Sequence, residues 1–243
     1  MPEPGPPPWR TPLFVALDVS TVSEALALGR AVAPHAGGLK LGLAFVLGAG
    51  PSGVAALAGL GRPLFLDVKL HDIPNTVAAA VRALSPLAPA ILTVHAAGGR
   101  AMLEAARAAC HGPTRLVAVT VLTSLDAADL AATGIQGPTE AQVLRLAALA
   151  RESGLDGLVC SAAEAPALRA QWPEALLVVP GIRPAGASAG DQKRAATPSA
   201  ALAAGASILV VGRPVTAAAD PAAAAAALAA EIAAAPSAPL PAP

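Results

Sequence analysis

Eight short runs of Val, Ile and Leu recur along this 243-residue chain, each bounded by Gly, Pro or polar residues. Most are apolar at consecutive positions, which is typical of parallel strands covered on both faces. Segments rich in Ala, Leu, Glu and Arg, with the character of helices, separate them. The strands are predicted at 13–17, 39–43, 64–68, 91–95, 116–121, 157–160, 176–179 and 207–211.

Strand and helix therefore alternate eight times, which predicts an α/β fold of one domain, a closed TIM (β/α)8 barrel. An open, doubly wound sheet is built from the same units and stays an alternative at this point. We expect a proline-rich arm over residues 1–12, the barrel over 13–235, and a disordered tail over 236–243.

Capping residues mark several of the predicted helices. Thr21 and Glu24 have the spacing of a capping box, and Asp220 precedes a proline in the usual order for a helix start. Residues 138–153 have a helical apolar face. The stretch 126–137 before that helix is interpreted as a polar connection.

Composition excludes several classes of function. The chain has 16 Lys and Arg against 16 Asp and Glu, and only 2% aromatic residues, so we expect no nucleic-acid partner. No strongly apolar run reaches the roughly 18 residues of a membrane-spanning helix, so we expect no membrane partner. The two cysteines, Cys110 and Cys160, are far apart, and the N-terminus has no apolar core of a signal peptide. A reduced, cytoplasmic protein is predicted.

Polar residues gather where the predicted strands end, at the end of a barrel that carries catalytic groups. Asp67 and Lys69 are two residues apart, so on a regular strand both would point to the same face. Asp18 and Lys40, at neighbouring strand ends, would supply opposite charges, since a lone buried charge is prohibitively costly. We expect the carboxylates to keep Lys69 protonated and able to donate a proton to a carbanion. A salt-bridge lattice that only fixes the barrel register is the alternative.

Other polar groups are less specific. Gly212 and Arg213 offer backbone N–H groups and a guanidinium to a phosphate, although a surface turn has the same composition. The stretch 183–193 fits either a mobile lid or a disordered connector. His95 fits either catalysis or support of the Lys/Asp network. We find no convincing metal site, serine hydrolase triad or cofactor motif, so chemistry without a cofactor is favoured.

The ordered motifs resemble the orotidine 5'-phosphate decarboxylase family. Residues 67–76 match its D-x-K-x-x-D-I-P-N-T signature. Further matches in the same order are ALD ending at Asp18, K-x-G at 40–42, VHAAGG at 94–99, VTVLTS at 119–124, VPGIRP at 179–184, DQ at 191–192, ATP at 196–198 and VVGRP at 210–214. The resemblance implies a TIM barrel, no cofactor or metal, and decarboxylation of orotidine 5'-phosphate to UMP.

The resemblance also implies roles for individual residues. Lys69 would donate the proton within a network of Lys40, Asp67 and Asp72, and Asp72 would reach into the site of the other subunit of a homodimer. Asp18 and Lys40 would hold ribose hydroxyls. Because the C6 carbanion is poorly delocalised, the ammonium would stabilise the developing charge before it protonates that carbon.

The remaining implied residues bind the substrate. Thr76 would also come from the partner subunit, Ile73 would bind substrate, Thr123 would contact the pyrimidine, and Pro180 would line the pocket. The phosphate, or the lid over it, would be held by Arg183, Gln192, Gly212 and Arg213.

Two rival functions stay open. A sugar-phosphate decarboxylase or aldolase of the same suprafamily would share the Asp-x-Lys-x-x-Asp core but work through an enediolate and Mg²⁺. A barrel that binds nucleotides without catalysis, as a sensor, is a rival from another class.

Overall fold

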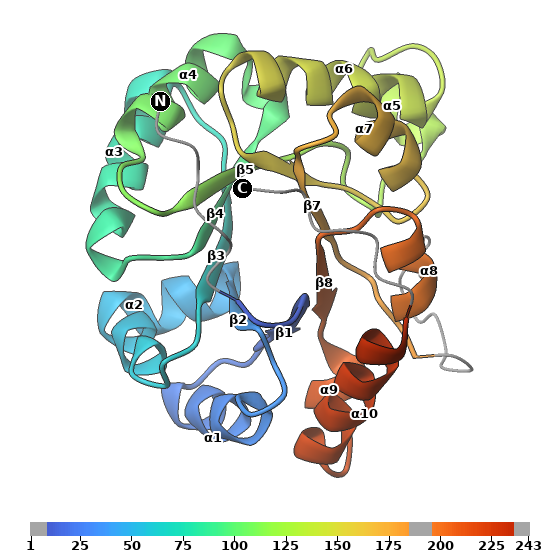
Figure 1. The fold of residues 1–243 in the computed structure, drawn as a ribbon. Helices are drawn as coiled ribbons and strands as arrows, with labels where there is room; N and C mark the ends of the chain where they lie inside the picture. Colours follow the sequence, from blue (N-terminus) through green and yellow to red (C-terminus); the bar gives the residue numbers. More distant parts are fainter. Residues whose placement is uncertain (1–8, 185–195, 236–243) are drawn as a thin grey trace.

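The chain forms a closed barrel of eight parallel strands, and the computed structural model describes residues 9–184 and 196–235 (Figure 1). The strands are β1 (Leu13–Ala16), β2 (Gly38–Gly42), β3 (Leu64–Leu70), β4 (Ile91–His95), β5 (Arg115–Val119), β6 (Gly157–Val159), β7 (Leu176–Val179) and β8 (Ile208–Val211). Because β8 pairs with β1, the sheet has no open edge. The barrel prediction is confirmed, and the open-sheet alternative is wrong.

Strand positions agree with the sequence, whereas several strand ends differ. β4 and β7 have the predicted bounds. β3 runs two residues further than expected, to Leu70, and β5 ends two residues earlier, at Val119. Both differences lie at the carboxyl end of the barrel, where side chains leave the regular ladder to form the pocket.

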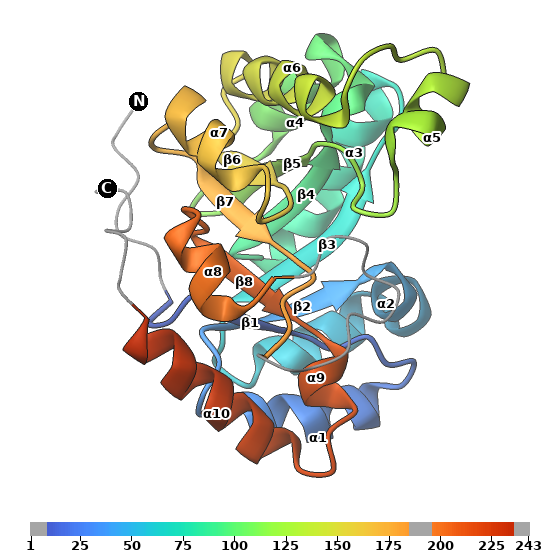
Figure 2. The same ribbon diagram turned by 90° about the vertical axis from the view of Figure 1, so that its right-hand side faces the viewer.

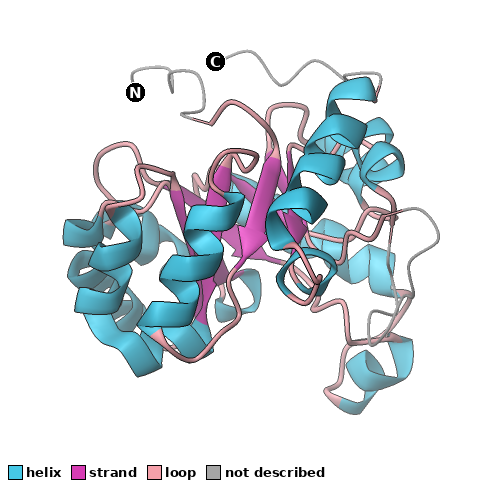
Figure 3. Cartoon of the chain, turned by 90° about the horizontal axis from the view of Figure 1, so that it is seen from below, coloured by secondary structure: helices cyan, strands magenta, loops and turns pink. Residues whose placement is uncertain are grey.

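Helices surround the barrel on its outside, as Figures 1 and 2 show. In the described residues they are α1 (Val22–Val32), α2 (Leu43–Ala58), α3 (Pro74–Leu84), α4 (Arg100–Ala109), α5 (Ala127–Ala132), α6 (Thr139–Glu152), α7 (Ala165–Gln171), α8 (Pro198–Ala203), α9 (Arg213–Thr216) and α10 (Pro221–Ala234), with 3-10 turns η1 (Ser85–Leu87) and η2 (Ala96–Gly98). Figure 3 shows the strands enclosed by this layer of helices. Each strand is thus covered on both faces, which explains its continuous apolar sequence.

The predicted caps are present with one difference. Asp220 accepts the Ala223 N–H at 3.0 Å, and Thr21 accepts the Glu24 N–H at 3.3 Å. The Glu24 carboxylate receives the Thr21 hydroxyl at 2.7 Å, so the reciprocal bond uses the side chain of Thr21 and not its backbone.

The polar stretch 126–137 contains a helix that the sequence interpretation missed. α5 begins after Asp126, which accepts the N–H groups of Ala128 and Asp129, and Asp129 in turn accepts the Asp126 N–H at 3.0 Å. This complete capping box stabilises a six-residue helix. The helix is too short for apolar periodicity to reveal it.

Aromatic side chains fill the amino-terminal end of the barrel. Trp9 is buried, and its ring meets Phe14 edge-on at a centroid distance of 5.5 Å. Phe14 contacts Phe65 in the same way at 6.4 Å. The indole therefore belongs to the barrel core, although the sequence prediction placed residue 9 in the arm. Residues 1–8 and 236–243 lie outside the described part of the chain.

Candidate active site

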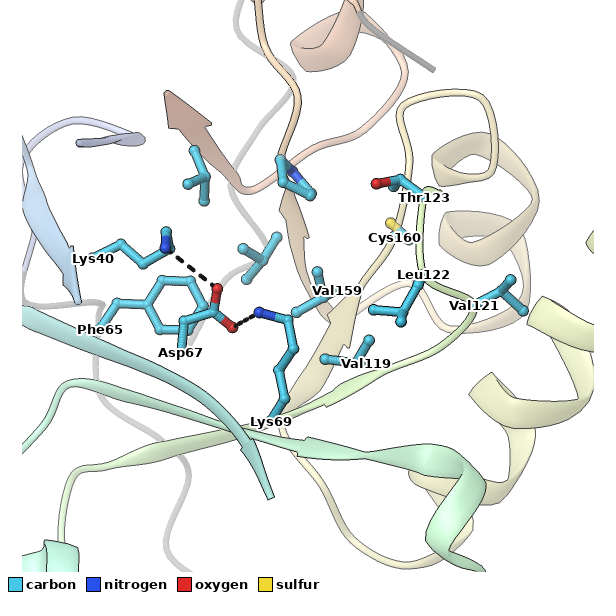
Figure 4. A pocket seen from close by; sticks show the side chains of 13 residues that line it. Lys40, Phe65, Asp67, Lys69, Val119, Val121, Leu122, Thr123, Val159 and Cys160 are labelled. Carbon is cyan, nitrogen blue, oxygen red and sulfur yellow. Dashed lines mark ion pairs between the residues drawn. The ribbon is translucent and has the colours of Figure 1, made fainter. Parts of the chain in front are cut away.

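A row of alternating charges crosses the carboxyl end of strands β1 to β3. Lys40 Nζ lies 3.1 Å from Asp18 Oδ1 and 3.5 Å from Asp67 Oδ2. Asp67 Oδ1 lies 2.7 Å from Lys69 Nζ, and Figure 4 shows this carboxylate between the two ammonium groups. Lys40 and Asp67 are buried at 8% and 9% exposure. Each buried charge therefore has an opposite charge beside it, as its desolvation requires.

Barrel register brings these residues together. Ala16 on β1 pairs with Lys40 on β2, and Gly42 pairs with Asp67 on β3, so the charged side chains lie at similar heights. A Cβ atom at Gly42 would lie 3.1 Å from Asp18 Oδ1 and 3.3 Å from Lys40 Nζ. The glycine of the K-x-G motif therefore leaves room for the ion pair.

Asp67 and Lys69 both line the pocket, but a regular strand is not the reason. The pairing of β3 with β4 shifts between Leu66 and Leu70, and Lys69 has a left-handed backbone with φ of 49°. This bulge replaces the simple alternation that the sequence spacing suggested. The expectation of a shared face holds, whereas its geometric basis was wrong.

Apolar side chains form the wall opposite the charges. Figure 4 shows Val119, Leu122 and Val159 on the side of Lys69 that faces away from Asp67 and Lys40. The complete lining is Lys40, Phe65, Asp67, Lys69, Val119, Val121, Leu122, Thr123, Val159, Cys160, Val178, Pro180 and Val210. An apolar wall lowers the local dielectric constant and strengthens the action of a fixed ammonium on nearby charge. Of the predicted ligand contacts, Thr123 and Pro180 are in this lining.

Two arginines follow β7 and β8. The pKa of Arg183 is lowered by burial and by the positive charge of Arg213, so the two guanidinium groups act on each other. Gly212 precedes Arg213, and a Cβ atom at Gly212 would lie 3.8 Å from Asp18 Oδ2. Cations held near each other favour an anion between them. Gln192 and most of the predicted lid, 183–193, lie outside the described residues.

The loop after β3 does not contribute to the pocket lining of its own chain. Asp72, Ile73 and Thr76 are exposed, and no ion pair links Asp72 to Lys69 within the described part of the chain. The Asp72 carboxylate accepts the Ile73 N–H at 2.6 Å. These three predicted residues are thus apart from the pocket of their own chain.

Two histidines flank the site without lining the pocket. The rings of His71 and His95 have centroids 5.3 Å apart. The pKa of His95 is lowered, first by burial and then by the charges of His71 and Lys69, with Asp67 acting in the opposite direction. The lowered pKa favours the neutral imidazole, and both roles weighed for His95, catalysis and support of the Lys/Asp network, stay predictions.

Neither a metal cluster nor a membrane span is evident where the chain is described. Residues 9–184 and 196–235 contain no group of three or more His, Cys, Asp and Glu arranged to hold a metal ion. None of the helices in those ranges is long and apolar enough to cross a bilayer.

Comparison with known proteins identifies the family. The model of the orotidine 5'-phosphate decarboxylase / HUMPS family matches residues 11–228. The chain belongs to this family. "Orotidine 5'-phosphate decarboxylase" of Sphingopyxis alaskensis is 59% identical over 86% of this chain and 94% of that protein. The protein of the same name from Thermobifida fusca is 56% identical over 86% of this chain and 90% of its own length.

Solved structures agree with this assignment. The crystal structure of orotidine 5'-phosphate decarboxylase from Lactobacillus acidophilus has a TM-score of 0.80 and 38% sequence identity, and the match covers 91% of this chain and 99% of that one. The resemblance inferred from the motifs is thereby confirmed.

Sequence reasoning missed part of this family member's site. It named the charged residues but not most of the apolar wall, because Val119, Val159 and Val178 look like any other strand residues. It also missed Thr93, a fully buried threonine whose hydroxyl contacts both the Lys69 backbone and Asp67. A polar residue inside the apolar run 91–95 was the only available signal.

Proposed function

We propose that this enzyme decarboxylates orotidine 5'-phosphate to UMP, the last step of de novo UMP synthesis, without a cofactor. The observation that carries the proposal is the position of Lys69, paired with Asp67 on one side of a pocket whose opposite wall is apolar. The names of the close relatives support the same reaction. Asp67 and Lys69 with Lys40 are the proposed catalytic groups, together with Asp72 from a second subunit.

Lys69 would act on the atom that becomes electron-rich. The bond between C6 and the carboxylate breaks, CO2 leaves, and the electron pair stays on C6 of the pyrimidine. An ammonium already fixed beside C6 stabilises this charge without reorganising solvent. Transfer of a proton from Lys69 Nζ to C6 gives UMP, and the resulting amine regains a proton from solvent.

The ion pairs support this role. The carboxylate of Asp67 contacts both Lys40 and Lys69, so it fixes the two ammonium groups in place. In the complex it would also lie near the substrate carboxylate, where repulsion would be relieved when CO2 departs. Asp18 and Lys40 would hold the ribose hydroxyls at the β1 end of the row of charges.

The phosphate would bind at the carboxyl ends of β7 and β8. Arg183 and Arg213 supply two positive charges there, and we place Gly212 and Gln192 in the same site. Binding energy from this remote group would close the segment 183–193 over the substrate and exclude water. Thr123 and Pro180 would contact the base, because both line the pocket.

We further propose a homodimer with shared active sites. Leu43, Leu47 and Ile73 expose 46%, 79% and 66% of their surface, which is unusual for large apolar side chains. Ile73 lies between Asp72 and Thr76, the residues expected to reach the partner's pocket. A contact that covers Ile73 would carry the same loop toward the second site.

A reducing cytoplasm is the proposed compartment. Cys110 and Cys160 are both buried, and no disulfide joins them in the described part of the chain. Burial raises the pKa of the Cys110 thiol, which disfavours the reactive thiolate.

The decisive experiment is incubation with orotidine 5'-phosphate in EDTA, with loss of substrate absorbance and formation of UMP as the readouts. We expect full turnover in EDTA and none from Lys69→Ala. Turnover that EDTA abolishes and Mg²⁺ restores would favour the sugar-phosphate rival. Tight UMP binding without turnover would favour the sensor. Thr114→Val is the matched control for expression and folding, because Thr114 is not among the residues that line the pocket.

A further inference from the structure

Thr93 lies where the register between two strands of the barrel shifts. The pairing of β3 with β4 stops after Leu66 and resumes at Leu70, so three residues of β3 lie opposite Thr93 alone. Asp67 and Lys69 are two of those three residues. Thr93 is completely buried, at 0% exposure, and it is not among the residues that line the pocket.

Its hydroxyl contacts both charged residues of the bulge. Thr93 Oγ1 accepts the backbone N–H of Lys69 at 2.9 Å. The same oxygen lies 3.2 Å from Asp67 Oδ1 and 3.5 Å from the carbonyl oxygen of Leu66. A hydroxyl has a single proton to donate, and the carboxylate is both the nearer and the stronger acceptor.

The backbone of Lys69 needs such support. Its φ of 49° lies in the left-handed region, which residues with a side chain rarely adopt and which persists only where the surroundings hold it. A bulge also removes the regular ladder partner of a residue. The Thr93 hydroxyl provides an acceptor for the Lys69 N–H at this position, in place of a strand carbonyl.

We propose that Thr93 is a positioning residue for the reaction, holding the Lys69 backbone and the Asp67 carboxylate so that the ammonium faces the reacting carbon. The inference rests on the proposed decarboxylation for its kinetic readout. Thr93 acts through Lys69 and Asp67 and does not touch the substrate. A displacement of the ammonium should impair the chemical step more than substrate binding, because the ribose and phosphate contacts stay in place.

The test compares Thr93→Val with Thr93→Ser. Valine keeps the shape of threonine without the hydroxyl, whereas serine keeps the hydroxyl. We expect kcat of Thr93→Val to fall about 10- to 100-fold, with KM for orotidine 5'-phosphate changed less than about threefold. Thr93→Ser should retain kcat within roughly threefold of the wild type. Equal kcat values for the Val and Ser variants would overturn the proposal.

A matched control separates positioning from general loss of structure. Thr114 is also a buried threonine, and its hydroxyl donates to the Pro89 carbonyl oxygen at 2.7 Å, away from the pocket lining. Thr114→Val should lower Tm while it leaves kcat unchanged. A fall in kcat as large as that of Thr93→Val would overturn the proposal. If Thr93→Val does not fold, Thr93→Ala against Thr93→Ser makes the same comparison.

A structural readout keeps the two proposals distinguishable. In a crystal structure of Thr93→Val, we expect Lys69 to leave its left-handed backbone or its Nζ to move away from Asp67. An unchanged φ and an unchanged Nζ–Oδ1 distance would overturn the positioning role even if the enzyme decarboxylates orotidine 5'-phosphate. Conversely, a wild-type protein without turnover would refute the proposed function, while this readout would still decide the role of Thr93.

Discussion

Oδ1 of Asp67 lies 2.7 Å from Nζ of Lys69, while the other oxygen of the same carboxylate lies 3.5 Å from Nζ of Lys40. One buried negative charge therefore separates two positive charges. Its neutralisation would remove the carboxylate charge beside Lys69 and leave Lys40 paired with Asp18 alone.

We expect Asp67→Asn to lower kcat for orotidine 5'-phosphate by about 100-fold or more, because the ammonium at Lys69 loses its fixed position. Asp156 is a matched control: it lies 2.8 Å from Arg107 and 3.6 Å from Arg115, outside the pocket lining. Asp156→Asn should destabilise the fold and leave kcat unchanged. Comparable kcat values for the two variants would contradict the assignment of Asp67.

The shared site predicts recovery of activity in mixed dimers. Lys69→Ala and Asp72→Ala chains, each inactive alone, should form one intact site per mixed dimer, or about a quarter of wild-type activity when mixing is statistical. The measurement is turnover after subunit exchange, with exchange verified by differently tagged chains. Verified exchange without any recovery would refute the role of Asp72 across the interface.

Arg213→Ala should weaken UMP binding much more than uridine binding. A charge-assisted hydrogen bond contributes about 1.5–3 kcal/mol, so a loss of roughly 10- to 100-fold in affinity for UMP is expected. Calorimetry with both ligands measures it. Arg30, exposed in the last turn of α1, supplies the control variant Arg30→Ala, which should bind both ligands normally. Equal losses for UMP and uridine in Arg213→Ala would argue against a phosphate contact.

His95 should make stability depend on pH. Its folded-state pKa lies below the ordinary value of 6.5, chiefly through burial, so the unfolded chain binds more protons between those two values. The free energy of unfolding should therefore fall as the pH drops through 6.5, then level off below the folded-state pKa. Denaturant titrations should show a weaker fall for His95→Gln, whereas the exposed His111→Gln should behave as wild type. If the free energy of unfolding of His95→Gln depends on pH as it does in the wild type, burial of His95 is not the cause of that dependence.

Trp9 should contribute to stability although it lies in a proline-rich segment. The residue is 7% exposed and its ring packs on Phe14, so Trp9→Ala should lower the free energy of unfolding by about 3 kcal/mol. Trp9→Phe should cost less, because it keeps an aromatic ring and removes an indole N–H that has no partner among the described residues. Denaturant midpoints would measure both, and an unaffected Trp9→Ala would show that the segment is dispensable.

Much of the fold could be predicted because parallel strands covered on both faces have an unmistakable apolar sequence. The charged residues Asp18, Lys40, Asp67 and Lys69 were also predictable, since strand ends in a barrel meet at one rim. Those inferences need only local sequence and a topology that repeats.

The bulge at Lys69 could not be predicted in this way. It depends on how β3 pairs with β4, which brings Thr93 opposite residues more than 20 positions earlier in the chain. Burial of Trp9 was missed for a related reason. Its proline neighbours favour an extended segment, and only the closed barrel supplies an aromatic surface for the indole.

The aromatic packing of Trp9, Phe14 and Phe65 closes the pocket toward the amino-terminal end of the barrel. Phe65 also lines the pocket, so the aromatic cluster closes the pocket at its inner end. Among residues 9–184 and 196–235, the side chains inside the barrel are buried against one another and leave no passage along its axis. We therefore expect substrate to enter, and both products to leave, at the carboxyl end of the barrel. Substrate entry and product release at this end, as well as bond breaking, can then limit the turnover rate.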